Sequence, residues 1–307
     1  MIVSFYNFFT LHNPSYMQHL LIKQCEKHDV VGTILLAPEG INGTISGYPY
    51  SVRSVLKYLE VILKETPFDI KISWNSTPPF HRIKVRLKKE IITLGIPNID
   101  VANQRGNYVD PKYWNNFLQD SDVFLVDTRN AYEVAIGTFK GALNPNTRSF
   151  REFPEWVDKK FDANKDSKIA LFCTGGIRCE KSIAFLKSRG YSNLFYLKGG
   201  ILKYLEDVPK SESLWKGECF VFDQRVSVDD HLNRGSYEMC YSCKMPLRKQ
   251  EQLHKDYKIG ISCPHCIQTL DEKKGRIKHI AVNLELAKAK KKRSSNNQCC
   301  LDIGKRL

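Results

Sequence analysis

Hydrophobic residues recur with two different periods in the first part of the chain, up to about residue 92. Short apolar runs at 2–9, 30–37 and 68–74 predict strands, and a return strand begins at Thr44 after the turn-forming residues 38–43. Residues 14–28 and 50–64 repeat apolar side chains every three or four positions, which predicts amphipathic helices. The order β-α-β-β-α-β predicts a ferredoxin-like α+β domain over residues 1–94.

A strictly alternating stretch follows this pattern. Its apolar positions are 83, 85 and 87, and the positions between and around them are basic: Arg82, Lys84, Arg86 and Lys88. In a strand, a period of two places these cations on one outer face. They form either a charged edge strand that prevents aggregation or a strip that contacts phosphates, and the pattern favours neither.

From residue 121 the pattern becomes α/β. Apolar runs at 123–127, 169–172 and 193–197 predict strands, and 153–161 and 179–187 predict helices between them. Strands that alternate with helices predict a mainly parallel sheet with its functional loops at one end. We assign residues 121–214 to this domain and residues 95–120 to a connector with a short helix from 110.

A cysteine stands at the end of the strand predicted at 169–172. After Cys173 the active loop continues with Thr174, Gly175, Gly176, Ile177 and Arg178. Backbone N–H groups converge at such a strand–loop–helix turn, which binds anions and favours thiolate over thiol. We therefore predict that Cys173 is a nucleophile and that Arg178 adds positive charge. The alternative is a buried structural cysteine, since free cysteines are usually buried.

Four further cysteines form two Cys-x-x-Cys pairs that are 19 residues apart: Cys240, Cys243, Cys263 and Cys266. This spacing fits a tetrahedral zinc site with four thiolate ligands. We predict a small zinc-ribbon-like module over residues 215–285 with a structural zinc ion. A module that had lost its metal would show the same spacing.

Composition narrows the class of protein. The formal net charge is +14, which indicates a polyanionic partner or only a basic surface. No run approaches the about 18 apolar residues that span a membrane, and the N-terminus lacks a signal peptide, so we expect a cytoplasmic protein without membrane contacts.

Basic residues also gather near the C-terminus. Nine lie within 273–293, and four of them form a second candidate RNA-binding strip: Lys273, Lys274, Arg276 and Lys278. Residues 286–307 are predicted to be a basic, disordered tail. A tail that only increases solubility is the alternative.

Three motifs of the α/β segment resemble the signatures of a rhodanese domain. They are Asp127-x-Arg129-x-x-x-Glu133, the loop at Cys173, and the Gly199-Gly200 turn. The rhodanese active loop has six residues, as Cys173 to Arg178 has here, whereas that of related phosphatases is one residue longer. The length therefore favours sulfur chemistry. We expect Asp127 and Arg129 to be structural, and Thr138, where many rhodaneses carry histidine, to leave the chemistry unchanged.

The order of motifs along the whole chain resembles that of the rhodanese-domain tRNA uridine hydroxylases, the TrhO or YceA-like family. The motifs are APEGINGTISG at 37–47, CTGGIRCEK at 173–181, GECFVFDQR at 217–225 and SCPHC at 262–266. The resemblance implies oxygen-dependent formation of 5-hydroxyuridine at the wobble position, with the tRNA anticodon loop as partner and molecular oxygen as co-substrate.

The resemblance also implies roles for loop residues. Cys173 would be the essential thiolate or carry a persulfide, and Arg178 would hold an anionic intermediate or a phosphate. Cys179 would resolve an oxidised Cys173 as a disulfide, or simply pack.

Two other functions remain open. One is a persulfide sulfurtransferase that serves tRNA thiolation, and the other is a non-catalytic RNA-binding protein with a vestigial loop. An intact Cys173 with both glycines and Arg178 argues against a vestigial loop. The sequence shows neither a facial triad of two histidines and a carboxylate nor a Rossmann fingerprint after a strand, so we predict no organic cofactor.

Overall fold

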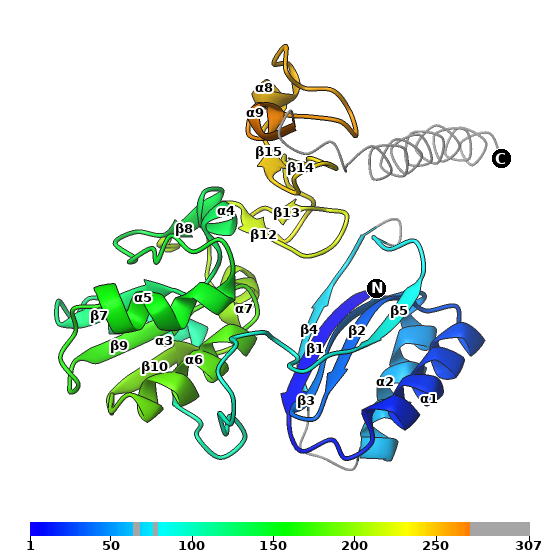
Figure 1. The fold of residues 1–307 in the computed structure, drawn as a ribbon, viewed down its shortest axis with the longest axis horizontal. Coiled ribbons are helices and arrows are strands. Elements are labelled where there is room, and N and C mark those ends of the chain that lie inside the picture. Colours follow the sequence, from blue (N-terminus) through cyan, green and yellow to red (C-terminus); the bar gives the residue numbers. More distant parts are fainter. Residues whose placement is uncertain (64–67, 76–78, 271–307) are drawn as a thin grey trace. The chain divides into compact units, whose positions relative to one another are not determined.

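The computed structural model describes residues 1–63, 68–75 and 79–270. The chain forms two compact units, Met1–Gly235 and a second unit that begins at Ser236. In Figure 1 the first unit runs from blue through cyan and green to yellow. No helix in the part of the chain that the structure describes is long and apolar enough to cross a membrane.

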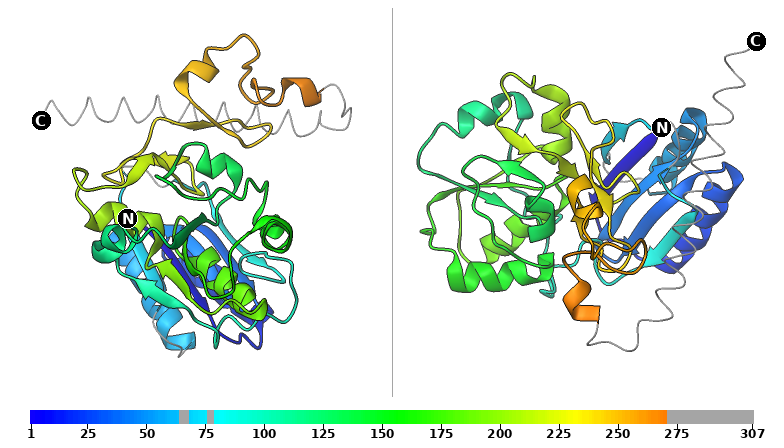
Figure 2. Two further views of the ribbon diagram at one scale, coloured as in Figure 1. Left: turned by 90° about the vertical axis from the view of Figure 1, so that its left-hand side faces the viewer. Right: turned by 90° about the horizontal axis from the view of Figure 1, so that it is seen from above.

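The N-terminal domain has the predicted ferredoxin-like arrangement. Its elements are β1 (Ile2–Phe8), α1 (Pro14–Lys27), β2 (Val31–Ala37), β3 (Gly40–Ser46), α2 (Pro49–Leu63), β4 (Asp69–Ser73) and β5 (Ile83–Leu87). The strand order is β4-β1-β3-β2-β5, antiparallel except for the parallel pair β2–β5. Both helices lie on the side of the sheet away from the α/β domain (Figures 1 and 2).

Helix α1 shows how local signals and packing combine. Asn13 caps its start by accepting the Tyr16 N–H at 3.0 Å, and Pro14 supplies a preset first turn. The inward face carries Leu21 and Cys25, both fully buried in one cluster with the sheet. Burial raises the pKa of the Cys25 thiol to about 12, so this core cysteine remains a neutral thiol at pH 7.

The basic strand β5 is an edge strand. Val85 is buried and Ile83 packs against the same core, as the alternation predicts, but Leu87 is 43% exposed. The expectation for Leu87 is wrong because this last strand residue lies beyond the core cluster. The register pairs Lys84 with Thr33 and Arg86 with Leu35, on the face opposite the helices.

The second domain is α/β and confirms the predicted, mainly parallel sheet. All strand pairs of this sheet are parallel, in the order β6-β10-β9-β7. Its strands and helices are β6 (Asn107–Val109), α3 (Pro111–Phe117), β7 (Val123–Asp127), α4 (Ala131–Val134), β8 (Gly137–Phe139), η1 (Phe150–Glu152), α5 (Phe153–Lys160), β9 (Lys168–Phe172), α6 (Ile177–Ser188), β10 (Leu194–Leu197) and α7 (Gly200–Asp207). One apolar cluster packs α5 and α6 on one face, and another packs α3 and α7 on the other. Within the segment expected to be a connector, residues 95–120, the structure has β6 and α3.

Residues 215–235 fold onto this domain. Strand β11 (Trp215–Gly217) pairs with β8, and β12 (Cys219–Phe220) pairs with β13 (Ser227–Val228). Cys219 is buried in the core of the α/β domain. The sequence pattern predicts this segment within the cysteine-rich module, whereas the structure includes it in the first unit.

The helix-free face of the N-terminal sheet packs against α6. Lys181 of α6 is 1% exposed and binds the carboxylates of Glu39 at 2.7 Å and Glu90 at 2.6 Å. Glu180 accepts the Tyr6 hydroxyl of β1 at 2.6 Å. These contacts attach the N-terminal domain to the helix that follows the active loop.

The second unit contains short elements around the four cysteines. They are β14 (Glu238–Met239), β15 (Pro246–Leu247), α8 (Lys249–Gln252) and α9 (Ile267–Leu270), with β14 antiparallel to β15. Leu247 and three of the cysteines form a small buried cluster. So few apolar residues indicate that a cross-link must supply much of the stability of this unit.

Candidate active site

The active loop holds Cys173 at the carboxyl end of β9, as predicted. Its sulfur accepts the Gly176 N–H at 3.0 Å, and α6 begins at the next residue. Gly176 has φ +102°, and a Cβ there would lie 2.8 Å from the Tyr6 hydroxyl. Only glycine therefore allows the loop to turn against the N-terminal sheet.

The Gly199-Gly200 turn supports the loop from its other side. The Ile201 N–H donates to the Cys173 carbonyl at 2.9 Å, and the Leu202 N–H donates to the Thr174 carbonyl at 3.1 Å. Gly200 has φ +68°, and a Cβ there would approach the Cys173 carbonyl oxygen to 2.5 Å. The third rhodanese motif thus fixes the backbone that carries the sulfur.

The surroundings of the Cys173 sulfur favour the thiolate. Burial alone would raise the pKa of the thiol, but a hydrogen bond from the Cys179 thiol, the charge of Arg178 and the N–H groups of Arg178 and Gly176 lower it to about 5. The pKa of Cys179 is raised well above its usual value, first by burial and then by its bond to Cys173. Cys173 is therefore ionised at neutral pH while Cys179 remains a thiol within hydrogen-bond reach.

Arg178 is held in a buried ion pair that no sequence pattern predicts. Its guanidinium donates to the two carboxylate oxygens of Glu133 at 2.7 and 2.8 Å. Burial would raise the pKa of the Glu133 carboxyl, but Arg178 lowers it, so the pair stays charged. With two donors committed to Glu133, Arg178 acts on the Cys173 sulfur through its field. Glu133 belongs to the first rhodanese motif, so the motif identifies this residue, but it does not show that Glu133 pairs with Arg178.

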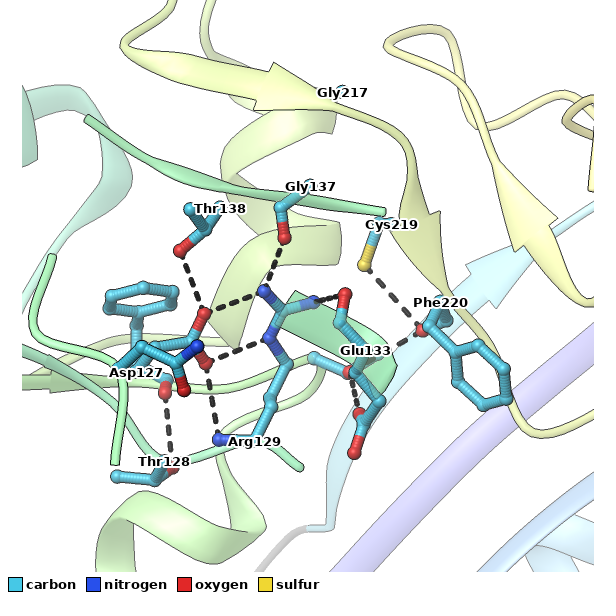
Figure 3. Close-up of polar contacts among 12 residues, drawn as sticks. Asp127, Thr128, Arg129, Glu133, Gly137, Thr138, Gly217, Cys219 and Phe220 are labelled. Carbon is cyan, nitrogen blue, oxygen red and sulfur yellow. Dashed lines mark hydrogen bonds and ion pairs between the residues drawn. The ribbon is translucent and has the colours of Figure 1, made fainter. Parts of the chain in front are cut away.

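Asp127 and Arg129 form a second buried ion pair (Figure 3). Arg129 donates to Asp127 at 2.6 and 2.9 Å and to the Gly137 carbonyl at 2.6 Å. Thr138 donates to the same carboxylate at 2.8 Å. These polar contacts are internal to the domain, which fits the structural role expected of the pair.

A cavity of about 560 Å³ lies over the loop, within the range of about 300–1,000 Å³ that is usual for small-molecule sites. Cys173 and Arg178 line it on the α/β side, and Ser4, Thr33 and Thr44 line it from the helix-free face of the N-terminal sheet. Cys173 has no exposed surface, so its sulfur is reached only through this cavity. A reactant must therefore be small, or must project one small group.

The predicted basic residues are placed unequally. Lys88 lines the cavity. Lys84 and Arg86 lie on β5, which begins at the residue after Arg82. The pKa of Lys84 is lowered by burial and then by the charges of Arg82 and Arg86, a repulsion that a phosphate would relieve. The other predicted strip, Lys273, Lys274, Arg276 and Lys278, lies outside the described residues, as does the tail 286–307.

Two cavity lysines were not predicted. Lys71 comes from β4 and Lys203 from α7, and both line the cavity beside the loop. Isolated lysines in separate elements have no spacing that a sequence pattern reveals.

The four cysteines of the second unit converge as the metal prediction requires. Their sulfur atoms all lie within 4.8 Å of one another, with 3.6 Å between Cys243 and Cys263 and 3.7 Å between Cys263 and Cys266. Four thiolates at about 2.3 Å from a tetrahedral zinc ion would be roughly 3.8 Å apart. The residues therefore fit a closed metal site. Zinc itself is a proposal that rests on this fit.

We predict that iodoacetamide alkylates Cys173 first, with a rate that rises near pH 5 and is constant above about pH 7, where the thiol is fully ionised. Peptide mapping after limiting reagent would measure this, with buried Cys25 as an internal control. Preferential labelling of Cys25, or a midpoint near the ordinary thiol pKa of about 8.5, would contradict the prediction.

We predict one zinc ion per chain, bound by the four clustered cysteines. Metal analysis of protein purified without chelator should find it, and Cys263→Ser should lose it. Cys173 should still be alkylated in that variant, because its loop belongs to the first unit. Metal-free protein with four reduced thiols would refute the site.

Comparisons with known proteins place the chain. A family model described as UPF0176 acylphosphatase like domain matches residues 1–91, and a rhodanese-like domain model matches residues 110–207. Among solved structures, a rhodanese-like domain from Anabaena sp. is 16% identical over 36% of this chain and 80% of its own, with a TM-score of 0.31. A human single-domain sulfurtransferase is 21% identical over 34% of this chain and 99% of its own, with a TM-score of 0.30.

A relative in Picosynechococcus sp., named tRNA uridine(34) hydroxylase, is 49% identical over 269 residues. The alignment covers 88% of this chain and 90% of that protein, so it extends well beyond either domain model. By this similarity along nearly its whole length, the chain belongs to the tRNA uridine(34) hydroxylase family.

Proposed function

We propose that this protein hydroxylates the wobble uridine of tRNA to 5-hydroxyuridine, with molecular oxygen as co-substrate. The observation that carries the proposal is a Cys173 thiolate beneath a cavity of about 560 Å³, in a chain 49% identical to a relative named for this reaction. A uracil ring can enter such a cavity only after leaving its stack. An anticodon loop presents unpaired bases for which this costs little.

The two loop cysteines support an electron balance for this reaction. Converting a C–H bond to C–OH with one atom of molecular oxygen leaves the other atom as water and consumes two electrons and two protons. Oxidation of the Cys173 thiolate and the Cys179 thiol to a disulfide releases two electrons and one proton, and the solvent supplies the second proton. Cys179 is buried in the same cluster as Cys173 and lowers its pKa, which supports Cys179 as the resolving residue.

A persulfide sulfurtransferase is the second candidate. The rhodanese-like match of residues 110–207 and the six-residue loop favour it, because a buried sulfur at the floor of a cavity protects a persulfide from solvent. A non-catalytic RNA-binding protein is the third, and it would not need Cys173.

Mass spectrometry of tRNA nucleosides separates these functions. In cells without the protein we expect 5-hydroxyuridine and its derivatives to be lost from position 34. Wild-type protein should restore them, and the nearly isosteric Cys173→Ser variant should not. Loss of a thiouridine instead would indicate sulfur transfer, and full restoration by Cys173→Ser would indicate a non-catalytic role.

We further propose that the basic residues of β5 and its flanks bind phosphates of the tRNA. Arg82, Lys84 and Arg86 form no ion pair with a described residue. Lys84 pairs with Thr33 and Arg86 with Leu35 in the sheet, and both of these partners line the cavity. Phosphate contacts give affinity without reading sequence. The C-terminal strip that includes Lys273 and Lys274 is a second proposed contact.

Charge reversal at Arg82 and Arg86 should weaken tRNA binding and flatten its salt dependence, by roughly 0.7–0.9 in log–log slope for each phosphate that is no longer bound. Alkylation of Cys173 should not change. Reversal of Arg53 and Lys57, which are exposed on α2 and therefore on the opposite face, is the matched control. If affinity and slope survive reversal at Arg82 and Arg86 and at Lys273 and Lys274, both strips are merely solvated.

A further inference from the structure

We propose that Phe222 is the platform on which the target base stacks, and that the GECFVFDQR motif exists to hold it there. The inference rests on the proposed function and names a residue that determines how the substrate is positioned. Phe222 lines the cavity above Cys173, yet 62% of the residue is exposed. A large apolar ring left open at the mouth of an active-site cavity needs an explanation that core packing does not supply.

Phe222 is the exposed member of the segment 220–225, in which Asp223 and Gln224 are half-buried and the other residues are buried. Phe220, Val221 and Arg225 are 2%, 4% and 5% exposed. The Phe222 ring meets the Phe220 ring edge-on at 5.1 Å between centroids, which fixes its orientation from behind. Because 62% of Phe222 is exposed, part of the ring surface is available to a flat ligand.

A buried ion pair makes the loop rigid. Arg225 donates to Asp223 from Nε at 3.0 Å and from Nη2 at 2.6 Å, and its backbone N–H binds the same carboxylate at 2.9 Å. The other guanidinium nitrogen reaches the Ser73 hydroxyl of β4 at 3.1 Å, which ties the loop to the N-terminal sheet. A platform held in place before binding loses little entropy when a base stacks on it.

The charge around the cavity selects a nucleotide as occupant over a neutral aromatic group. Six basic side chains line it, and two of them, Lys88 and Arg151, form no ion pair with a described residue and are therefore available to an anion. The guanidinium of Arg178 lies 5.7 Å from the centroid of the Phe222 ring, which places the platform beside the group that stabilises the Cys173 thiolate. An aromatic face next to excess positive charge is the arrangement that binds unpaired bases with their phosphates.

The test combines removal of the ring with removal of the base. RNA hairpins carrying the anticodon loop, with uridine or an abasic nucleotide at position 34, are titrated against full-length wild-type protein and Phe222→Ala. We expect the abasic change to weaken binding to wild type about ten-fold, and binding to Phe222→Ala by much less, because the base has lost its partner. Phe222→Trp should retain wild-type affinity and hydroxylation, and Phe222→Leu, which is apolar but has no π face, should not.

Tyr113→Ala is the matched control, since Tyr113 is 67% exposed on α3 and does not line the cavity. Full activity in Phe222→Leu, or equal losses from the abasic change in wild type and Phe222→Ala, would overturn the inference and leave the proposed function standing. Wild-type protein that binds neither hairpin would overturn both. Wild-type protein that shows the binding pattern but forms no 5-hydroxyuridine would overturn only the proposed reaction.

Discussion

The ion pair between Glu133 and Arg178 holds the active loop in its shape. Both groups are almost fully buried, and removing one partner from such a pair costs about 3–5 kcal/mol because the other charge is left uncompensated. The pair connects α4 to the first turn of α6 and keeps a cation near the Cys173 sulfur. Because Glu133 balances that cation, the thiolate is stabilised without creating a strong site for adventitious anions.

The same turn of α6 joins the chemistry to the N-terminal domain. Cys179 lowers the pKa of the Cys173 thiol, Glu180 accepts the Tyr6 hydroxyl, and Lys181 binds Glu39 and Glu90. Three consecutive residues therefore contact either the nucleophile or the N-terminal domain. A shift of the N-terminal sheet would for this reason also move the active loop. The cavity needs both domains, because the sheet supplies the wall opposite the sulfur.

Paired and unpaired charges of the first unit lie in different places. Near the Cys173 sulfur, Arg178 is paired with Glu133, and two further buried pairs are Asp127 with Arg129 and Asp223 with Arg225. The neighbouring cations Arg82 and Arg86 lower the pKa of Lys84 by repulsion, in addition to the larger effect of burial. This division suits the proposed function, in which a polyanion is held while a single base enters the cavity.

The sequence by itself determined the features that depend on local spacing. Periods of two and about 3.6 predicted the strands and helices, the six-residue loop predicted Cys173 and its amide donors, and the paired cysteines predicted the clustered ligands of the second unit. Only the tertiary structure decided which side chains from distant segments meet. Glu133 on Arg178, Lys71 at the cavity, Phe222 at its mouth and residues 215–235 on the α/β domain all depend on packing between separate elements. Glu133 and Arg178 are 45 residues apart, and a contact between residues so far apart produces no periodic pattern in the sequence. Burial and pairing of this kind are properties of the assembled fold.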